Sequence, residues 1–102
     1  MIEVEFFREP DGTLTGYTFS GHSDYAEQGS DIVCAAVSSA AYMAANTISD
    51  ILHVPVEAEV EDGFMSVRLP EPEKAQDILR GLRLHLQALS GQYPDDINFR
   101  EV

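Results

Sequence analysis

One cysteine and one histidine give this sequence its clearest capacity for chemistry. Cys34 is the only cysteine among 102 residues, and His22 precedes it by twelve positions. A thiolate is a strong nucleophile, and a neighbouring imidazole can stabilise it and then return a proton to a leaving amine. A Cys–His pair can act without a third member, although Asp24 or Asp31 could orient the imidazole. If the fold brings the two side chains together, they form a cysteine nucleophile.

The helix that must position Cys34 is expected from about Ile32 to His53. Ser30 or Asp31 is its expected N-cap, since either side chain can accept a hydrogen bond from a first-turn amide. Cys34 would then lie in the first turn, where the helix dipole favours an anion and free N–H groups can bind an oxyanion. The alternative is that Cys34 is simply a small buried apolar residue of an Ala-rich helix.

His22 belongs to an expected loop over residues 21–30, bracketed by Gly21 and Gly29. Ten residues is long for a small domain, and long ordered loops are often functional. Ser38 follows Cys34 by one helical turn, so it either lines the same pocket or hydrogen-bonds to a backbone carbonyl.

The remaining pattern predicts an α+β fold in the order β-β-α-β-β-α-β, with two helices packed on one face of a mostly antiparallel sheet. Residues 1–102 form a single domain. In residues 54–61, Val54, Val56, Ala58 and Val60 alternate with glutamates, which predicts a half-buried strand whose Glu57, Glu59 and Glu61 face solvent. Strands are expected over 2–8, 14–20, 64–69 and 97–102, and a second helix from Pro72 to a cap at Gly91.

The net charge of −12 disfavours direct binding to nucleic acid, because such proteins normally present a basic patch. Residues 1–53, which contain Cys34 and His22, hold eight acidic residues and one basic residue. A cationic partner would be attracted to this half of the chain. An acidic surface that merely maintains solubility is the alternative.

A single cysteine forms no internal disulfide, which favours a reducing, cytoplasmic compartment. The charged, alternating N-terminus is not expected to be a targeting segment, and the apolar stretch 32–45 is expected to be too short to span a membrane. His53 is expected at a helix end and His85 at a surface or boundary position. One cysteine and three scattered histidines lack metal-site spacing, so no cofactor or metal is expected.

The segment GHSDYAEQGSDIVCAAVSSA resembles the signature of the ribosomal-processing cysteine protease family, the Prp family. The matching residues are Gly21, His22, Tyr25, Ala26, Gly29, Asp31, Ile32, Val33, Cys34, Ala35, Val37 and Ser38. Ser23 departs from the family pattern, in which alanine is usual, and adds a hydroxyl beside His22. The resemblance extends over essentially the whole chain.

The resemblance implies a cytoplasmic, homodimeric endopeptidase that removes the N-terminal extension of a large-subunit ribosomal protein. It makes Cys34 the nucleophile and His22 its partner. Gly21, Ser23, Asp31 and Ser38 are expected to support the site or contact the substrate. The expected substrate is a basic ribosomal protein precursor, which the acidic character of residues 1–53 suits.

Two other functions fit parts of the pattern. A non-catalytic assembly factor would bind a basic ribosomal protein through its acidic surface, in a complex that is sensitive to salt but not to loss of Cys34. A thiol redox sensor would need an external thiol, since the chain has no second cysteine to resolve a sulfenic acid.

Overall fold

The computed structural model describes residues 1–21 and 28–102, with side chains from Ile32 onward in the second range. Its element order confirms the predicted β-β-α-β-β-α-β arrangement. The main elements are β1 (Ile2–Arg8), β2 (Leu14–Ser20), α1 (Gln28–Asn46), β3 (Glu57–Glu61), β4 (Phe64–Arg68), α2 (Gln76–Gln92) and β5 (Ile97–Glu101). A π-helical turn, Thr47–Ile51, extends α1, and a 3-10 turn, Pro72–Ala75, precedes α2.

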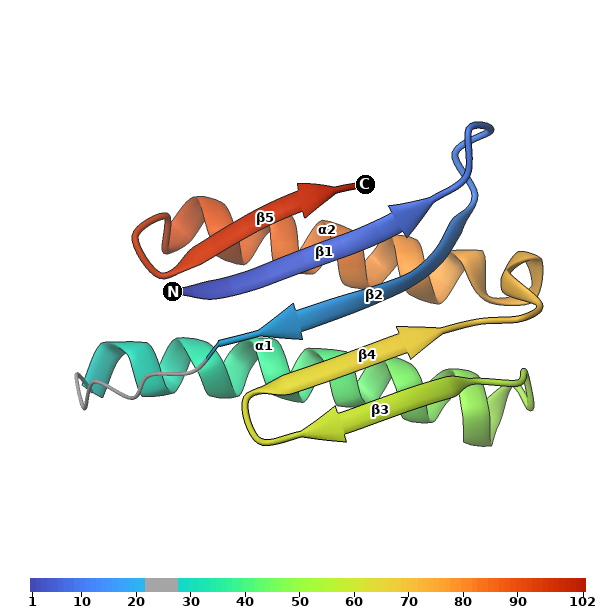
Figure 1. Cartoon of the computed structure of the whole chain (residues 1–102), viewed down its shortest axis with the longest axis horizontal. Helices are drawn as coiled ribbons and strands as arrows, with labels where there is room; N and C mark the ends of the chain where they lie inside the picture. The colour runs from blue at the N-terminus through green and yellow to red at the C-terminus, as the bar shows by residue number, and fades with distance from the viewer. Residues whose placement is uncertain (22–27) are drawn as a thin grey trace.

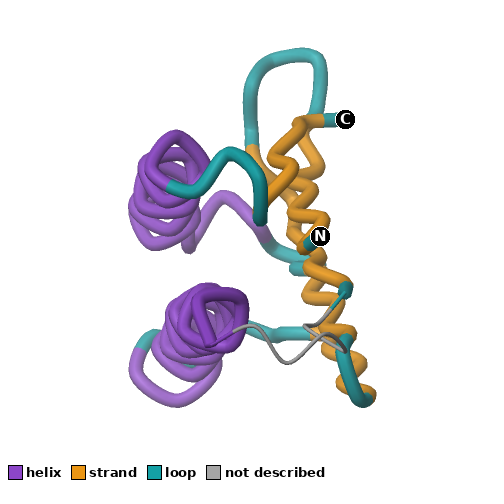
Figure 2. Tube along the Cα trace, turned by 90° about the vertical axis from the view of Figure 1, so that its left-hand side faces the viewer, coloured by secondary structure: helices purple, strands orange, loops and turns teal. Residues whose placement is uncertain are grey.

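The five strands form one sheet in the order β3-β4-β2-β1-β5 (Figure 1). Neighbouring strands are antiparallel except β1 and β5, which are parallel. Both helices lie on the same face of the sheet, and within residues 1–21 and 28–102 the opposite face carries no helix (Figure 2). The prediction of two helices on one face of a mostly antiparallel sheet is therefore confirmed.

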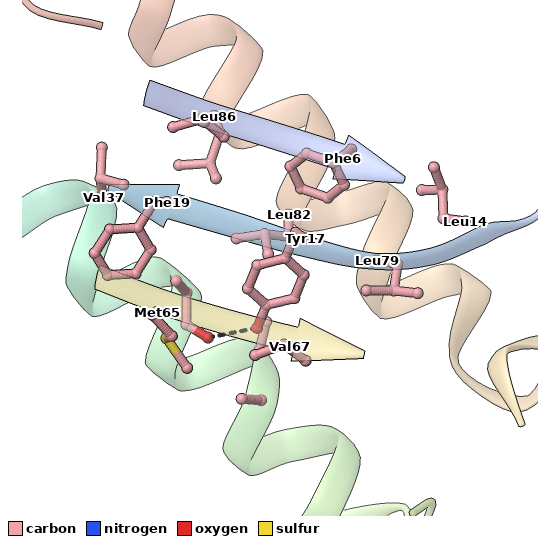
Figure 3. Close-up of a cluster of buried hydrophobic side chains, with 14 of the residues drawn as sticks. Phe6, Leu14, Tyr17, Phe19, Val37, Met65, Val67, Leu79, Leu82 and Leu86 are labelled. Atoms are coloured by element: carbon pink, nitrogen blue, oxygen red, sulfur yellow. Dashed lines mark hydrogen bonds between the residues drawn. The ribbon is translucent and has the colours of Figure 1, made fainter. Parts of the chain in front are cut away.

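The core lies between the sheet and the two helices, and apolar side chains from both layers fill it (Figure 3). Phe6 on β1 packs its ring against Tyr17 on β2 and Phe99 on β5, with centroids 5.6 and 5.7 Å apart. The buried residues of α1 are Val33, Val37, Ala41, Ala44 and Ala45, and Ile48 of the π-turn continues their face. Their three- and four-residue spacing is that of a single helix face.

The start of α1 differs from the sequence-based prediction. The helix begins at Gln28, so Gly29, Ser30 and Asp31 belong to its first turn, and the predicted N-cap at Ser30 or Asp31 is wrong. The expected loop over 21–30 is therefore shorter at its C-terminal end. Glycine and serine are poor helix formers and prompted the later start, but such intrinsic preferences are small and are readily overridden by context.

The C-terminal end of the first helix is wider than a regular α-helix. After Asn46 the chain makes a π-turn, closed by a hydrogen bond from the Leu52 amide to the Thr47 carbonyl at 2.9 Å. The Thr47 hydroxyl donates to the Met43 carbonyl at 2.8 Å. Such a side-chain bond is a common companion of a local departure from the regular ladder. His53 then ends the helical region with φ 56°.

The helical run Ile32–Ile51 spans 20 residues and is apolar enough, by length and composition alone, to cross a membrane. The expectation that this apolar segment is too short to span a membrane is therefore wrong, because the helix continues beyond residue 45. Val33, Val37 and Ala41 are nevertheless buried against the sheet, as in the core helix of a folded domain.

The strand after this helix is also placed differently. Val54 is buried and Val56 is half-buried, but neither belongs to β3, and all five residues of β3 are exposed. The half-buried strand predicted for 54–61 is thus wrong for Ala58 and Val60. They do share the face of buried Val67 and Met65, their register partners on β4. Because β3 is the outermost strand of the sheet, no strand beyond it helps to cover that face.

The second helix confirms its predicted apolar stripe, with Leu79, Leu82 and Leu86 buried. Its predicted cap at Gly91 is wrong, since α2 continues to Gln92 and the cap residue is Tyr93, whose amide bonds to the Leu89 carbonyl. The Gln76 side-chain amide accepts a bond from the Leu14 amide at 2.9 Å and donates to the Leu14 carbonyl at 2.7 Å. This pair fixes the start of α2 to the start of β2.

Candidate active site

Cys34 lies in the second turn of α1, six residues after the helix begins at Gln28. The expectation of a first-turn cysteine is therefore wrong. In a helix the amides without an intrahelical acceptor belong to the first turn, which precedes Cys34, and the helix dipole acts most strongly there. The thiol is free and half-buried, at the edge of the core cluster. It is accessible to solvent from one side, as a nucleophile must be.

The side of α1 on which Cys34 lies follows from helical geometry. Ala40, Met43 and Ala44 line a groove of about 190 Å³ together with residues of α2, so they mark the flank of α1 that faces α2. At 100° per residue, Cys34 and Ser38 fall on the opposite flank. Cys34 therefore faces away from α2, and this is the side of α1 nearer to the β4–β3 edge of the sheet (Figure 1).

Ser38 is half-buried one turn after Cys34, and Tyr42 is 38% exposed one turn further on. The three share the flank that faces away from α2. Sequence reasoning did not single out Tyr42. Cys34, Ser38 and Tyr42 nevertheless follow one another at four-residue intervals, a spacing that predicts a shared helix face. The flank thus presents a thiol, a hydroxyl and a phenol in line.

Gly21 directly follows β2 and has a conformation that suits glycine. Its φ is +96°, and a Cβ added there would come within 2.3 Å of the Met1 carbonyl oxygen. Its amide donates to the Gly63 carbonyl at 2.9 Å, which ties the end of β2 to the β3–β4 turn. Glycine is therefore required at the position that follows β2.

The other predicted site residues are only partly covered by the structure. His22 and Ser23 lie outside the described residues. Asp31 belongs to the first turn of α1, but its side chain is not described. The end of β2 and the start of α1 lie at the same end of the molecule (Figure 1). The pairing of Cys34 with His22 stays a prediction.

The described histidines do not enter this region. His53 is exposed at the far end of the first helix, and His85 is exposed on α2 beside the groove between the helices. These placements confirm the expected helix-end and surface positions. Within residues 1–21 and 28–102, no three His, Cys, Asp or Glu side chains gather as metal ligands would.

Comparisons with known proteins identify the family. A model of the family described as cysteine protease Prp matches residues 1–98. The ribosomal processing cysteine protease Prp of Bacillus subtilis is 27% identical over 105 residues, covering 95% of this chain and 94% of that protein. The protein of the same name from Staphylococcus aureus strain Mu50 is 29% identical over 101 residues, covering 95% of each.

Solved structures give the same result. A crystal structure of the ribosomal processing protease Prp from S. aureus with a substrate peptide superposes with a TM-score of 0.91, at 26% identity and full coverage of both chains. A structure of that protease with a covalently linked product peptide gives a TM-score of 0.89 at 27% identity, again over both full chains. The comparisons favour an enzyme over a non-catalytic assembly factor. The family match over nearly the whole length shows that this chain belongs to the cysteine protease Prp family.

Proposed function

We propose that this protease removes the N-terminal extension of a large-subunit ribosomal protein precursor, with Cys34 as nucleophile and His22 as its partner. The observation that carries the proposal is the position of Cys34. The only thiol of the chain is half-buried on a helix flank that α2 leaves uncovered, and its motif agrees with the family resemblance. Relatives that bear the name ribosomal processing protease support the choice of substrate.

The proposed reaction is acyl transfer in two steps. The Cys34 thiolate attacks the scissile carbonyl, the C–N bond breaks, and the His22 imidazolium gives its proton to the leaving amine. Neutral His22 then takes a proton from water as the water oxygen attacks the thioester carbonyl. The C–S bond breaks, the acid product leaves and loses its proton to solvent, and the Cys34 thiolate and His22 imidazolium are restored. Ser38 is proposed to support the site or contact the substrate, because it is half-buried one helical turn after Cys34.

Ser23 and Asp31 are proposed as supporting residues. Ser23 adjoins His22 in the sequence, and Asp31 precedes Cys34 by three positions. Gly21 supports the site by its backbone, since its positive φ sets the direction in which the chain leaves β2. No metal or organic cofactor is required for this chemistry, in which the thiol and the imidazole supply the nucleophile and the proton.

The charge of the chain suits a basic substrate. Acidic residues outnumber basic ones by twelve, and a cationic ribosomal protein would be drawn to the enzyme by long-range attraction that salt weakens. The proposed location is the cytoplasm, where ribosomal proteins are made and a lone thiol stays reduced. The proposed assembly is a homodimer, as the resemblance implies, and sedimentation equilibrium would test it.

The test is intact-mass analysis of the ribosomal protein precursor after incubation with the wild-type enzyme, Cys34→Ala or Cys34→Ser. A single N-terminal cut by the wild type alone is expected, since the serine hydroxyl is a far weaker nucleophile than the thiolate. Circular dichroism of both variants would show that the fold is retained. Cleavage by Cys34→Ala at the wild-type rate would exclude Cys34 as the nucleophile.

A further inference from the structure

The outermost strand of the sheet, β3, is exposed along its whole length. It pairs with β4 on one side, and all five of its residues are exposed. In the described part of the chain, nothing pairs with its other side. In an antiparallel ladder every second residue of an edge strand directs its N–H and C=O away from its partner. An added extended strand can bind to such backbone groups.

The charge along β3 selects the kind of strand that would fit. Glu57, Glu59 and Glu61 alternate with Ala58 and Val60, so the three carboxylates share the face of the sheet away from the helices. Arg68 stands opposite Glu57 in the ladder, whereas Ser66 and Phe64 stand opposite Glu59 and Glu61. Glu59 and Glu61 therefore have no basic residue directly opposite them on β4, and Glu61 has none diagonal to it.

A second copy of β3 is a poor occupant of this edge. Pairing two such strands would place glutamates opposite or diagonal to glutamates, and like charges in cross-strand positions are destabilising. An extended peptide with lysine or arginine at alternate positions would place positive charges beside these glutamates, so the cross-strand interaction would be attractive. The edge therefore fits a basic extended segment from another protein.

The position of β3 relative to Cys34 gives the orientation of that segment. β3 runs toward the end of the sheet where the β3–β4 turn meets Gly21 and where α1 begins (Figure 1). Cys34 and Ser38 lie on the flank of α1 that faces away from α2. Figure 1 shows α1 on the β4–β3 side of the sheet and α2 on the β1–β5 side, so this flank points toward the β3 side. A strand added antiparallel to β3 would have its N-terminal end near the Cys34 end of the molecule.

We infer that the open edge of β3 binds, as an added antiparallel strand, the basic segment of the substrate that follows the scissile bond. This inference rests on the proposed function for the identity of the substrate. Five residues of β3 correspond to about 16 Å of extended chain, so it can hold a segment of about five residues. The enzyme would thereby bind part of the mature ribosomal protein as well as the extension that it removes.

The first experiment measures binding without cleavage. The probe is a capped ten-residue peptide of alternating lysine and threonine, titrated into ¹⁵N-labelled Cys34→Ala enzyme. Chemical-shift changes centred on residues 57–61 are expected. Two further peptides, N-methylated at all lysine or at all threonine amides, test for backbone pairing, and at least one should fail to bind. No shift at 57–61, or binding that survives both methylation patterns, would overturn the inference.

The second experiment measures cleavage of the ribosomal protein precursor. The variant Glu57→Gln/Glu59→Gln/Glu61→Gln should raise KM roughly tenfold, as expected for three exposed charge pairs, and leave kcat unchanged. The matched control, Glu9→Gln/Glu73→Gln/Asp95→Asn, removes the same charge from exposed residues elsewhere and should change KM less than twofold. Equal KM values for the two triple variants would overturn the inference.

The orientation has its own test. Replacing the basic residues after the scissile bond by glutamine should raise KM for the wild type but not for the β3 triple variant. If only replacements before the scissile bond have this effect, the antiparallel orientation is wrong. If the wild type does not cleave the precursor at all, the proposed function fails, while the peptide titration still decides whether β3 binds a basic strand.

Discussion

The hydroxyl of Tyr17 on β2 donates a hydrogen bond to the carbonyl oxygen of Ala41 on α1, 2.7 Å away, inside the core (Figure 3). Tyr17 is 1% exposed and Ala41 is fully buried. The bond joins the helix that carries Cys34 to a central strand of the sheet. It therefore helps to fix the position of α1, and with it Cys34, along the direction of β2.

Tyr17→Phe should lower the free energy of unfolding by about 1 kcal/mol, the usual net value of a buried hydrogen bond. The loss is limited because the Ala41 carbonyl keeps its place in the helical ladder. Urea denaturation at pH 7 measures the change. Tyr42→Phe removes the hydroxyl of a tyrosine that is 38% exposed, and a change below about 0.5 kcal/mol is expected for it. Equal losses for the two variants would contradict this account.

Tyr17 should also make the protein sensitive to alkali. Burial raises the pKa of its phenol above the ordinary value of 10, so above about pH 10 the unfolded chain releases this proton while the folded protein retains it. The free energy of unfolding then falls by up to about 1.4 kcal/mol per pH unit. The contribution of the protonated Tyr17 phenol to stability is fully present only below about pH 10. In urea denaturation from pH 9 to 11.5, the wild type should lose its advantage over Tyr17→Phe within about one unit above pH 10. A constant difference would rule this out.

Gly21→Ala should destabilise the protein more than Gly12→Ala. Both glycines have φ near +95°, but a Cβ at Gly21 would meet the Met1 carbonyl at 2.3 Å, whereas nothing lies within 4 Å at Gly12. Backbone strain should cost each variant about 1–2 kcal/mol, and the clash adds to it only at Gly21. Thermal unfolding gives the difference. We also expect slower precursor cleavage by Gly21→Ala alone, since Gly21 directs the chain into His22.

His53→Gly should stabilise the protein by about 0.5–1 kcal/mol. His53 is exposed and has φ 56°, a left-handed conformation that costs energy for any residue with a Cβ. The matched control is His85→Gly, in the middle of α2, where glycine weakens the helix and the sign should be reversed. Chemical denaturation of both variants decides the point, and a stability loss at His53 would contradict the strain argument.

His22→Ala should slow alkylation of Cys34 by iodoacetamide near neutral pH. An imidazolium beside the sulfur stabilises the thiolate, so its removal should shift the alkylation profile to higher pH. The profile is measured from pH 5 to 10 by mass spectrometry. His85→Ala, which alters an exposed histidine on α2, should leave it unchanged. Identical profiles for the wild type and His22→Ala would mean that the two residues do not form a pair.

The sequence by itself determined the order of the elements and the residues with chemical capacity. Alternation in strands such as Ile2–Arg8 and the leucine spacing of α2 are local signals, because each repeats with the period of its own element. Cys34 could be singled out because it is the only thiol, and the motif around it identified the family. The role of Gly21 was visible only as a residue beside His22.

The tertiary structure decided the features that depend on neighbours distant in sequence. The strand order left β3 at the edge, so Ala58 and Val60 are exposed despite a pattern typical of a buried face. Packing on the sheet accommodated a helix that begins at Gln28, which moved Cys34 from the first turn to the second. The need for glycine at position 21 arises from the Met1 carbonyl, twenty residues away. Such contacts leave no periodic trace in the sequence, because they join elements whose spacing along the chain is unrelated to their separation in space.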